Sequence, residues 1–341
     1  MPSPPDLPKR DIVVIGASAG GVEALRGFFH ALPADLPAAF LVVLHIPADT
    51  PSQLDRVLGA STPLAVKIAQ DGEAISNGQV YVASADRHLM VTPQGIRLSR
   101  GPKEGRSRPS IDVLFRSAAT AFGSRVIGVI LSGALDDGTA GLWAVKDHQG
   151  VTLVQAPDEA MYSSMPQSAI AHVQVDLVGT VEALAARVGK LVGTAAPEGV
   201  QRDNAQLALE NHIAMEGNAL KAGVMNLGKV SKYTCPDCHG VLVQIEEGPI
   251  VRFRCHTGHA FSLKSLMAQV NEAIDTGLWA TLRAIEERVM LLRQMEQLAQ
   301  ASGAGDEAAR LHKEAEASEK RIQPLRKLVL DPLFFSHTAK G

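Results

Sequence analysis

The sequence has few aromatic residues, few cysteines and no long apolar run. Phe, Trp and Tyr make up 4% of the 341 residues, so the core has to be mainly aliphatic. The three cysteines are an odd number and all lie late in the chain, which argues against a disulfide scaffold. No apolar run reaches the ~18 residues that cross a bilayer, and the N-terminus lacks the apolar segment of a signal peptide. We therefore expect a cytoplasmic protein without membrane insertion.

The charge of the chain is almost balanced. The 33 basic and 36 acidic residues give a formal net charge of −3, which is no electrostatic reason to expect a nucleic-acid partner. An apolar fraction of 46% with a charged fraction of 20% is usual for globular proteins, so wholesale disorder is excluded. At roughly 100–200 residues per domain, the length predicts two or three domains.

Short apolar strands alternate with amphipathic helices up to about residue 195, after a tail at 1–10 that we expect to be disordered. This alternation predicts that 11–195 form an α/β domain with a doubly wound, mostly parallel sheet in three α/β/α layers. Ligands of such sheets bind at the carboxyl ends of the strands. The expected strands are 11–15, 40–45, 80–84, 88–92, 126–132, 151–155 and 175–179, and the expected helices are 20–30, 109–122, 138–148, 165–171 and 181–192.

A glycine-rich turn at 16–21 follows the first expected strand and contains Ser18. Unpaired amides at the start of the next helix would lie ready for an oxyanion beside this serine. The turn fits the nucleophile-elbow pattern, but the preceding 17 residues leave no room for the strands that an α/β-hydrolase needs. It also fits a dinucleotide phosphate loop, but His45 stands where that fold expects an acid for the ribose. The simplest alternative is that Ser18 caps the helix.

A histidine and two aspartates follow the neighbouring apolar strands. His45 ends the second strand, and a histidine can take the proton of a serine nucleophile. Asp136 and Asp137 follow the strand at 126–132, and one of these acids could orient the histidine ring. Each has an ordinary alternative, as a satisfied histidine or as an acid at a helix start. Together, three strand ends present serine, histidine and aspartate on one rim of the sheet.

These segments resemble the catalytic domain of the CheB-type chemotaxis receptor methylesterases over residues 11 to about 193. The resemblance implies a doubly wound α/β fold, hydrolysis of glutamate γ-methyl esters on chemoreceptors, and deamidation of receptor glutamines. It implies no metal or organic cofactor for catalysis. The matching segments are IGASAGG (15–21), VLHIP (43–47), VYVASADRHL (80–89), RPSIDVLFRSAA (108–119), VILSGALDDGTAGL (129–142) and DEAMYSSMPQSAI (158–170).

The resemblance makes Ser18 the nucleophile, His45 the general base and Asp137 the orienting acid. Backbone amides near Ala19 and Ala134 would be the oxyanion donors. Ser18 would attack the ester carbonyl, His45 would protonate the departing methanol, and water would hydrolyse the acyl-enzyme. The alternative is a non-enzymatic signalling scaffold that keeps this fold and binds a receptor, a methyltransferase or a histidine kinase.

The sequence departs from the family pattern in two places. The family has a GMGxDG-like turn, whereas this chain has GALDDG at 133–138, with Ala134 in place of a methionine and Leu135 in place of a glycine. We therefore expect a different pocket. The first strand begins at residue 11, so we also expect no phosphoacceptor receiver domain ahead of it. Control would then come from the C-terminal region or from a separate partner, such as a methyltransferase or a histidine kinase.

All three cysteines fall in one segment with a histidine. Cys235 and Cys238, followed by Cys255 and His259, match the Cys₃His pattern of a structural zinc site. The alternatives are three free thiols, or His256 or His239 as the fourth ligand. Nearly balanced charge around them argues against nucleic-acid binding. We expect a linker with a short helix at 196–231 and a zinc-ribbon-like unit at 232–262.

Apolar residues at helical spacing follow this unit. The spacing continues to Met295, and Gly303 and Gly305 interrupt it. A helical hairpin is therefore predicted over 263–335. Its default role is internal packing, and a partner surface is the alternative.

Overall fold

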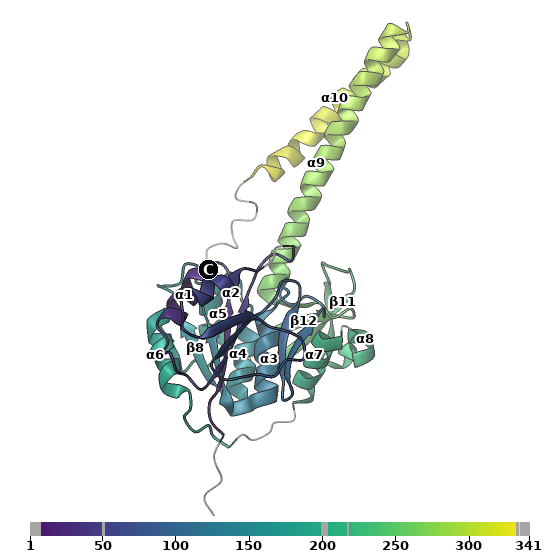
Figure 1. Ribbon diagram of the computed structural model, residues 1–341. Coiled ribbons are helices and arrows are strands. Elements are labelled where there is room, and N and C mark those ends of the chain that lie inside the picture. The colour runs from purple at the N-terminus through teal and green to yellow at the C-terminus, as the bar shows by residue number, and fades with distance from the viewer. Residues whose placement is uncertain (1–7, 50–51, 199–203, 217, 332–333, 335–341) are drawn as a thin grey trace, which may run out of the picture. The chain divides into compact units, whose positions relative to one another are not determined.

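Seven parallel strands form the central sheet in a computed structural model of the protein (Figure 1). The residues that it describes are 8–49, 52–198, 204–216, 218–331 and 334. The sheet order is β3-β4-β2-β1-β7-β8-β9. Its strands are β1 (Ile12–Ala17), β2 (Ala39–Leu44), β3 (Ala65–Ile68), β4 (Gln79–Val82), β7 (Val126–Ile130), β8 (Val151–Gln155) and β9 (Leu177–Gly179).

Helices cover both faces of this sheet, which explains why its middle strands are apolar throughout. Every residue of β1, β2 and β7 is buried, and a sheet buried on both faces needs continuous rather than alternating apolar residues. One face packs against α1 (Gly21–His30), α2 (Leu54–Gly59) and α6 (Val181–Leu191). The other packs against α3 (Ile111–Phe122), α4 (Thr139–Asp147) and α5 (Ser164–His172). The predicted three-layer, doubly wound fold is confirmed.

The chain winds outward in both directions from β1, which lies between β2 and β7. Ala17 pairs with Leu44, and Gly16 pairs with Ile130. The three strands therefore end at nearly the same level of the sheet. A switch in winding direction opens a crevice at the carboxyl ends of the strands, so the residues that follow β1, β2 and β7 face one site.

The sequence reading missed several short elements. β3 and α2 were not predicted, and neither was β6 (Gly95–Ser99), which pairs with β5 (His88–Thr92) in an antiparallel hairpin. β3 lies at the edge of the sheet and none of its residues is buried. It therefore lacks the apolar run that marks the central strands.

Residues 1–266 form one compact unit, which includes the Cys/His segment. The region expected to be a linker contains α7 (Ala205–Glu216), whose Glu210, Ile213 and Ala214 are completely buried, and α8 (Ala219–Ala222). Ser99 donates its hydroxyl to the Ala214 carbonyl, so α7 is tied to the β5–β6 hairpin. An antiparallel sheet follows, which we name the Cys/His unit (residues 229–262). Its strands are β10 (Lys229–Thr234), β11 (Val241–Glu247), β12 (Ile250–Cys255) and β13 (Ala260–Ser262).

Part of the expected N-terminal tail is attached to the α/β domain. Residues 1–7 lie outside the described residues. Lys9 forms an antiparallel bridge with Ala195, and the Arg10 amide donates to the Thr194 carbonyl at 3.0 Å. The end of the predicted 1–10 tail is therefore held in place.

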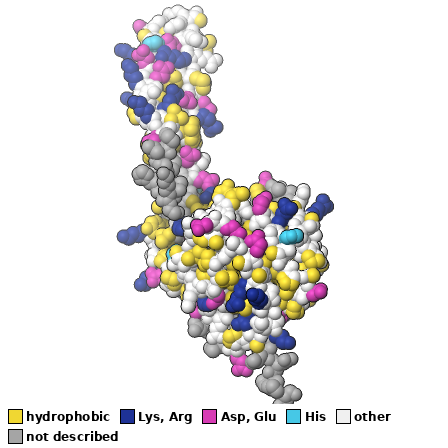
Figure 2. Space-filling model, turned by 90° about the vertical axis from the view of Figure 1, so that its left-hand side faces the viewer, with side chains coloured by type: hydrophobic (Ala, Val, Ile, Leu, Met, Phe, Trp, Pro, Cys, Tyr) yellow, Lys and Arg dark blue, Asp and Glu magenta, His cyan; other side chains and the backbone are white. Residues whose placement is uncertain are grey.

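Residues 267–341 form a second compact unit. It comprises most of α9 (Leu263–Ala301) and all of α10 (Gly305–Val329), which pack together through Leu292, Leu311 and Ala315. Arg293 pairs with Glu319 across the two helices at 3.2 Å, and Figure 2 shows basic and acidic side chains interspersed along them. Among the described residues, no helix combines the length and apolarity that crossing a membrane requires.

Candidate active site

Ser18 lies in the tight turn between β1 and α1. Its amide donates to the Ser132 carbonyl at 2.9 Å, and Gly20 has a left-handed φ of 69°. A Cβ at Gly20 would lie 2.8 Å from the Cβ of Met161, so the backbone and the neighbour both require glycine. The N-cap of α1 is Gly20, and no side chain caps this helix. The helix-cap interpretation of Ser18 is therefore wrong.

His45 connects the serine to an aspartate. Its amide continues the sheet by donating to the Ala17 carbonyl at 3.1 Å. Its ring places Nδ1 3.1 Å from Ser18 Oγ and Nε2 2.7 Å from Asp137 Oδ2. A carboxylate only accepts hydrogen bonds, so Nε2 carries the proton that faces Asp137. Nδ1 is then the acceptor for the Ser18 hydroxyl.

Asp137 is held by the N-terminus of α3. Its Oδ2 accepts from the Ile111 amide at 2.8 Å, and its Oδ1 accepts from the Asp112 amide and the Ser110 hydroxyl, both at 3.0 Å. Burial opposes ionisation of this carboxyl, but the bonds from His45 and the amides outweigh it and lower the pKa of Asp137. The aspartate therefore stays charged and fixed, as the orienting group of a triad must.

Sequence analysis did not identify Ser110 as a support of Asp137. The Ser110 side chain makes no cap bond to α3 and donates to Asp137 instead. The available signal was the segment RPSIDVLFRSAA at 108–119. Its partner lies 27 positions away along the chain, so only the fold reveals the contact.

The pocket over the serine has a volume of about 270 Å³. Within the described part of the chain, the amides of Ala19 and Ala134 have no hydrogen-bond partner, whereas the Ser18 amide is committed to Ser132. The oxyanion role of Ala19 and Ala134 stays a prediction. The residues that line the pocket are Ser18, His45, Gly105, Arg106, Ser107, Ala134, Leu135, Asp136 and Asp137.

A nucleophile, a base and an orienting acid in this order can carry out acyl transfer. A sequence model described as CheB methylesterase matches residues 13–188, just over half of the chain. The chain belongs to the CheB methylesterase family. A crystal structure of the Thermotoga maritima CheB methylesterase catalytic domain is 33% identical, with a TM-score of 0.53, and the match covers 54% of this chain and all of that one.

Two curated relatives illustrate the extent of the match. A protein-glutamate methylesterase/protein-glutamine glutaminase of Methanosarcina acetivorans is 37% identical over 192 residues, which are 54% of this chain and 54% of the relative. A putative protein of the same designation from Leptospira interrogans is 38% identical over 176 residues, which are 51% of this chain and 91% of the relative. The chain spans about half the length of most of the curated relatives considered.

The turn in which this CheB-family chain departs from the family pattern carries backbone strain. Leu135, expected from the resemblance to replace a glycine, has a φ of 62°, in the left-handed region that costs side chains with a Cβ about 1–2 kcal/mol. Nearby, a Cβ on Gly133 would lie 2.9 Å from the Cβ of Ser18. The turn therefore packs against the nucleophile at Gly133, where there is no room for a side chain.

The Cys/His unit brings together the four predicted ligand residues. One donor atom from each of Cys235, Cys238, Cys255 and His259 lies within 4.8 Å of the others. Hydrogen bonding between the Cys235 and Cys255 thiols lowers the pKa of Cys255 and raises the pKa of Cys235, and hydrogen bonding to Cys255 raises the pKa of His259 to about 9. The cluster thus holds thiolate charge that a divalent metal would neutralise. Neither of the alternative fourth ligands, at 239 and 256, belongs to this cluster in the described residues.

A second carboxyl group, partly buried, lies beside the triad. Asp112 accepts from the Gly141 amide at 2.6 Å, and burial together with the charge of Asp137 raises the pKa of Asp112 well above its usual value. In the unfolded chain this group ionises near pH 4. The folded state therefore loses stability as the pH rises from about 4 through the raised pKa.

We expect Leu135→Gly to be more stable than Leu135→Ala by about 1 kcal/mol. Both substitutions remove the side chain beyond Cβ, but only glycine removes the Cβ that makes a positive φ costly. Urea denaturation of the two variants measures the difference. Equal free energies of unfolding would contradict the strain at this position.

We expect Asp112→Asn to raise the free energy of unfolding by about 1 kcal/mol at pH 7, with the gain vanishing near pH 4. Asparagine keeps an oxygen for the Gly141 amide and cannot ionise. Chemical denaturation from pH 4 to pH 8 tests this, with Asp35→Asn at an exposed position as the control. A gain that is independent of pH would rule out the charge explanation.

Proposed function

We propose that this protein is a protein-glutamate methylesterase, with glutaminase activity, that acts on methylated chemoreceptor-like signalling proteins. One observation carries the proposal: the Ser18–His45–Asp137 chain, with distances of 3.1 and 2.7 Å, stands at the switch point of a CheB-family sheet. The names of the relatives, which pair glutamate methylesterase with glutamine glutaminase, support the substrate class. The geometry required of a base and nucleophile is present without substrate, so nothing specific favours the non-enzymatic scaffold.

The proposed reaction begins when Ser18 Oγ attacks the ester carbonyl carbon and its proton passes to His45 Nδ1. Asp137 stabilises the imidazolium through Nε2. The amides of Ala19 and Ala134 would stabilise the oxyanion. As the tetrahedral intermediate collapses, the bond to the methoxy group breaks and His45 protonates the leaving methanol. Water then hydrolyses the acyl-enzyme by the same steps and releases glutamate.

A glutamine side chain would follow the same route with ammonia as the leaving group. No step needs a metal or an organic cofactor. Control by a partner, such as a methyltransferase or a histidine kinase, remains a prediction of the sequence.

We expect Ser18→Ala to lower the rate of methanol release by at least about 10³-fold, because members of a triad act as a unit. The measurement is methanol released from methylated chemoreceptor membranes. Ser61→Ala is the control and should keep the parent rate. It removes a hydroxyl that donates to the Val57 carbonyl of α2. Equal release by the parent and Ser18→Ala would refute the nucleophile assignment.

We also propose that Cys235, Cys238, Cys255 and His259 hold a structural zinc ion. Four donors of this type close a tetrahedral site with no open position, so the metal would stabilise the fold rather than take part in the esterase chemistry. The short distances within the cluster, such as 3.6 Å between Cys235 Sγ and His259 Nδ1, support this proposal.

Elemental analysis of the purified protein should find about one zinc per chain. We expect Cys255→Ser to lose the metal and His256→Ala to retain it, because residue 256 is adjacent to a ligand but is outside the cluster. A folded parent protein without metal, or equal losses in both variants, would contradict the assignment.

A further inference from the structure

Two parts of the wall around the Ser18–His45 pocket are held by residues of the Cys/His unit. We infer that Arg254 and Ser262 are positioning residues of the active site, and that the fold of the Cys/His cluster acts on the site through them. The inference rests on the proposed function. It adds that the Cys/His unit, which follows the catalytic residues in the chain, controls the shape of the active-site pocket.

The first held part is the wall loop, residues 103–108, of which 105–107 line the pocket. This loop turns tightly, with Glu104 and Ser107 exchanging backbone hydrogen bonds of 3.2 and 3.0 Å. It pairs with β13: the Gly105 amide donates to the Ala260 carbonyl at 2.8 Å, and the Ala260 amide donates to the Lys103 carbonyl at 3.2 Å. The loop is therefore attached to the Cys/His unit through its backbone.

A buried ion pair fixes the same loop through a side chain. Glu104 is 3% exposed, and its carboxylate accepts from Arg116 and from Arg254, each at 2.8 Å. Burial opposes the charge, but the two guanidinium groups outweigh it and lower the pKa of Glu104. A buried charge that loses its partner is strongly destabilised. Without Arg254, Glu104 would keep its bond to Arg116 on α3 but would lose its tie to the Cys/His unit, so Arg254 is one of the two charges that set the position of the wall loop.

Arg254 in turn lies next to the turn that carries Cys255 and His259, two of the proposed metal ligands. It precedes Cys255 in the chain, and its Nη1 donates to the Gly258 carbonyl at 2.9 Å, next to His259. The Gly258 amide bonds back to the Cys255 carbonyl at 2.9 Å. The turn that carries two of the four cluster residues thus sets the position of the guanidinium group that holds Glu104.

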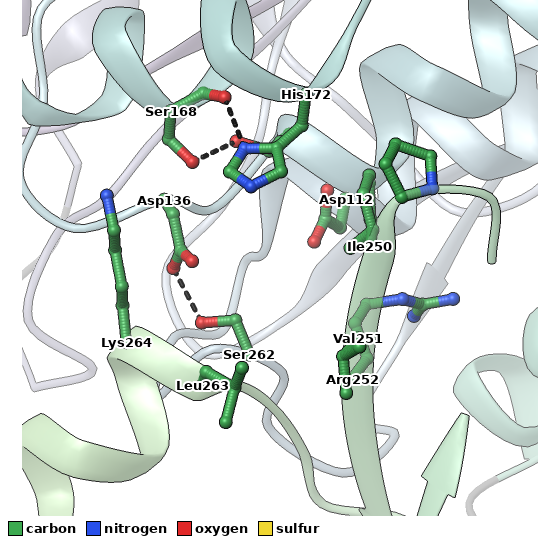
Figure 3. A pocket seen from close by; sticks show the side chains of 13 residues that line it. Asp112, Asp136, Ser168, His172, Ile250, Val251, Arg252, Ser262, Leu263 and Lys264 are labelled. Carbon is green, nitrogen blue, oxygen red and sulfur yellow. Dashed lines mark hydrogen bonds between the residues drawn. The ribbon is translucent and has the colours of Figure 1, made fainter. Parts of the chain in front are cut away.

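The second held part is the turn that carries the triad aspartate. Figure 3 shows Ser262, at the end of β13, directed at Asp136, and its hydroxyl donates to Asp136 Oδ1 at 2.7 Å. Asp136 lines the pocket and precedes Asp137. Ser262 also exchanges hydrogen bonds with Ser265 in the first turn of α9, at 2.8 and 3.0 Å. The bonds with Ser265 therefore hold the Ser262 side chain in the orientation that its bond to Asp136 requires.

Arg254, Ala260 and Ser262 all lie beyond residues 13–188, the segment that matches the family. The family segment supplies the triad and every residue that lines its pocket, and the C-terminal extension of this chain holds two parts of that lining from behind. A loose Cys/His unit should therefore release the wall loop and shift the Asp136–Asp137 turn. Small misplacements of this kind cost catalysis out of proportion to their size.

Limited trypsin digestion tests the hold on the wall loop without using the esterase activity. Trypsin can cleave the wall loop after Lys103 and Arg106, whereas Pro109 blocks cleavage after Arg108. Cleavage after Lys103 or Arg106 therefore reports release of the loop. The full chain with Ser18→Ala is digested as isolated and after removal of metal with a chelator, and Arg254→Gln is digested in the same background. We expect cleavage at 103–108 to become about tenfold faster in both cases. Cleavage at Arg56, on α2, should keep its rate.

Unchanged cleavage at 103–108 in both cases would overturn the inference. Equal acceleration at Arg56 would also overturn it, because the unit would then support the whole fold rather than the wall loop. A failure of the proposed esterase function leaves this result unaffected, since Ser18→Ala is inactive by design.

The second arm compares Ser262 with its capping partner. Ser262→Ala removes the bond to Asp136 and the bond that the Ser262 hydroxyl accepts from the Ser265 amide. Ser265→Ala removes the reciprocal bond that its hydroxyl accepts from the Ser262 amide, and leaves the hydroxyl that bonds Asp136. We expect Ser262→Ala to lower kcat for methanol release about tenfold with little change in KM, and Ser262→Thr to restore it. Ser265→Ala should stay within about twofold of the parent. Equal losses in the two alanine variants, or no loss in Ser262→Ala, would overturn the positioning role.

Discussion

The active site depends on one buried carboxylate. Asp137 is 7% exposed, and a charge at that depth is stable only when hydrogen-bond donors surround it. The donors come from the N-terminus of α3, from Ser110 and from His45. Satisfying this one charge thus fixes the spacing between β7 and α3 and the orientation of the histidine ring. The position of the ring in turn decides where the Ser18 proton can go.

A second buried charge network joins the Cys/His unit to the α/β domain. Removing one partner of such a network costs roughly 3–5 kcal/mol, although the intact network is weak evidence for stability. Its value is geometric, because these ion pairs form together only when α3, α7, β11, β12 and the wall loop are packed as they are here. This accounts for the inclusion of the Cys/His unit in the same compact unit as the sheet. The members are Arg116, Arg252 and Arg254 with Glu104, Glu210 and Glu247.

The location of the candidate site could be predicted because Ser18, His45 and the Asp136–Asp137 pair follow strands that are recognisable by themselves. Strands buried on both faces are continuous apolar runs, and parallel strands around a switch point place their carboxyl ends together. Ser18, His45 and Asp137 each come directly after such a run or its turn. The Cys/His cluster was equally predictable, since ligand spacing is a local property. Short elements with exposed residues, such as β3, carry no comparable signal.

The sequence by itself determined the parallel sheet, the rim that carries Ser18, His45 and two aspartates, and the spacing of the four cluster residues, because each depends on local periodicity or on spacing along the chain. The choice of Asp137 and the triad roles came from the resemblance to the CheB family. Only the tertiary structure decided what surrounds them. The many charged residues of the wall loop are typical of a solvent-exposed loop, yet Glu104 is buried between Arg116 and Arg254. Ser262 reaches Asp136 across 126 positions of the chain. Contacts of this kind depend on how separate elements pack, and no local pattern encodes which buried charge will meet which.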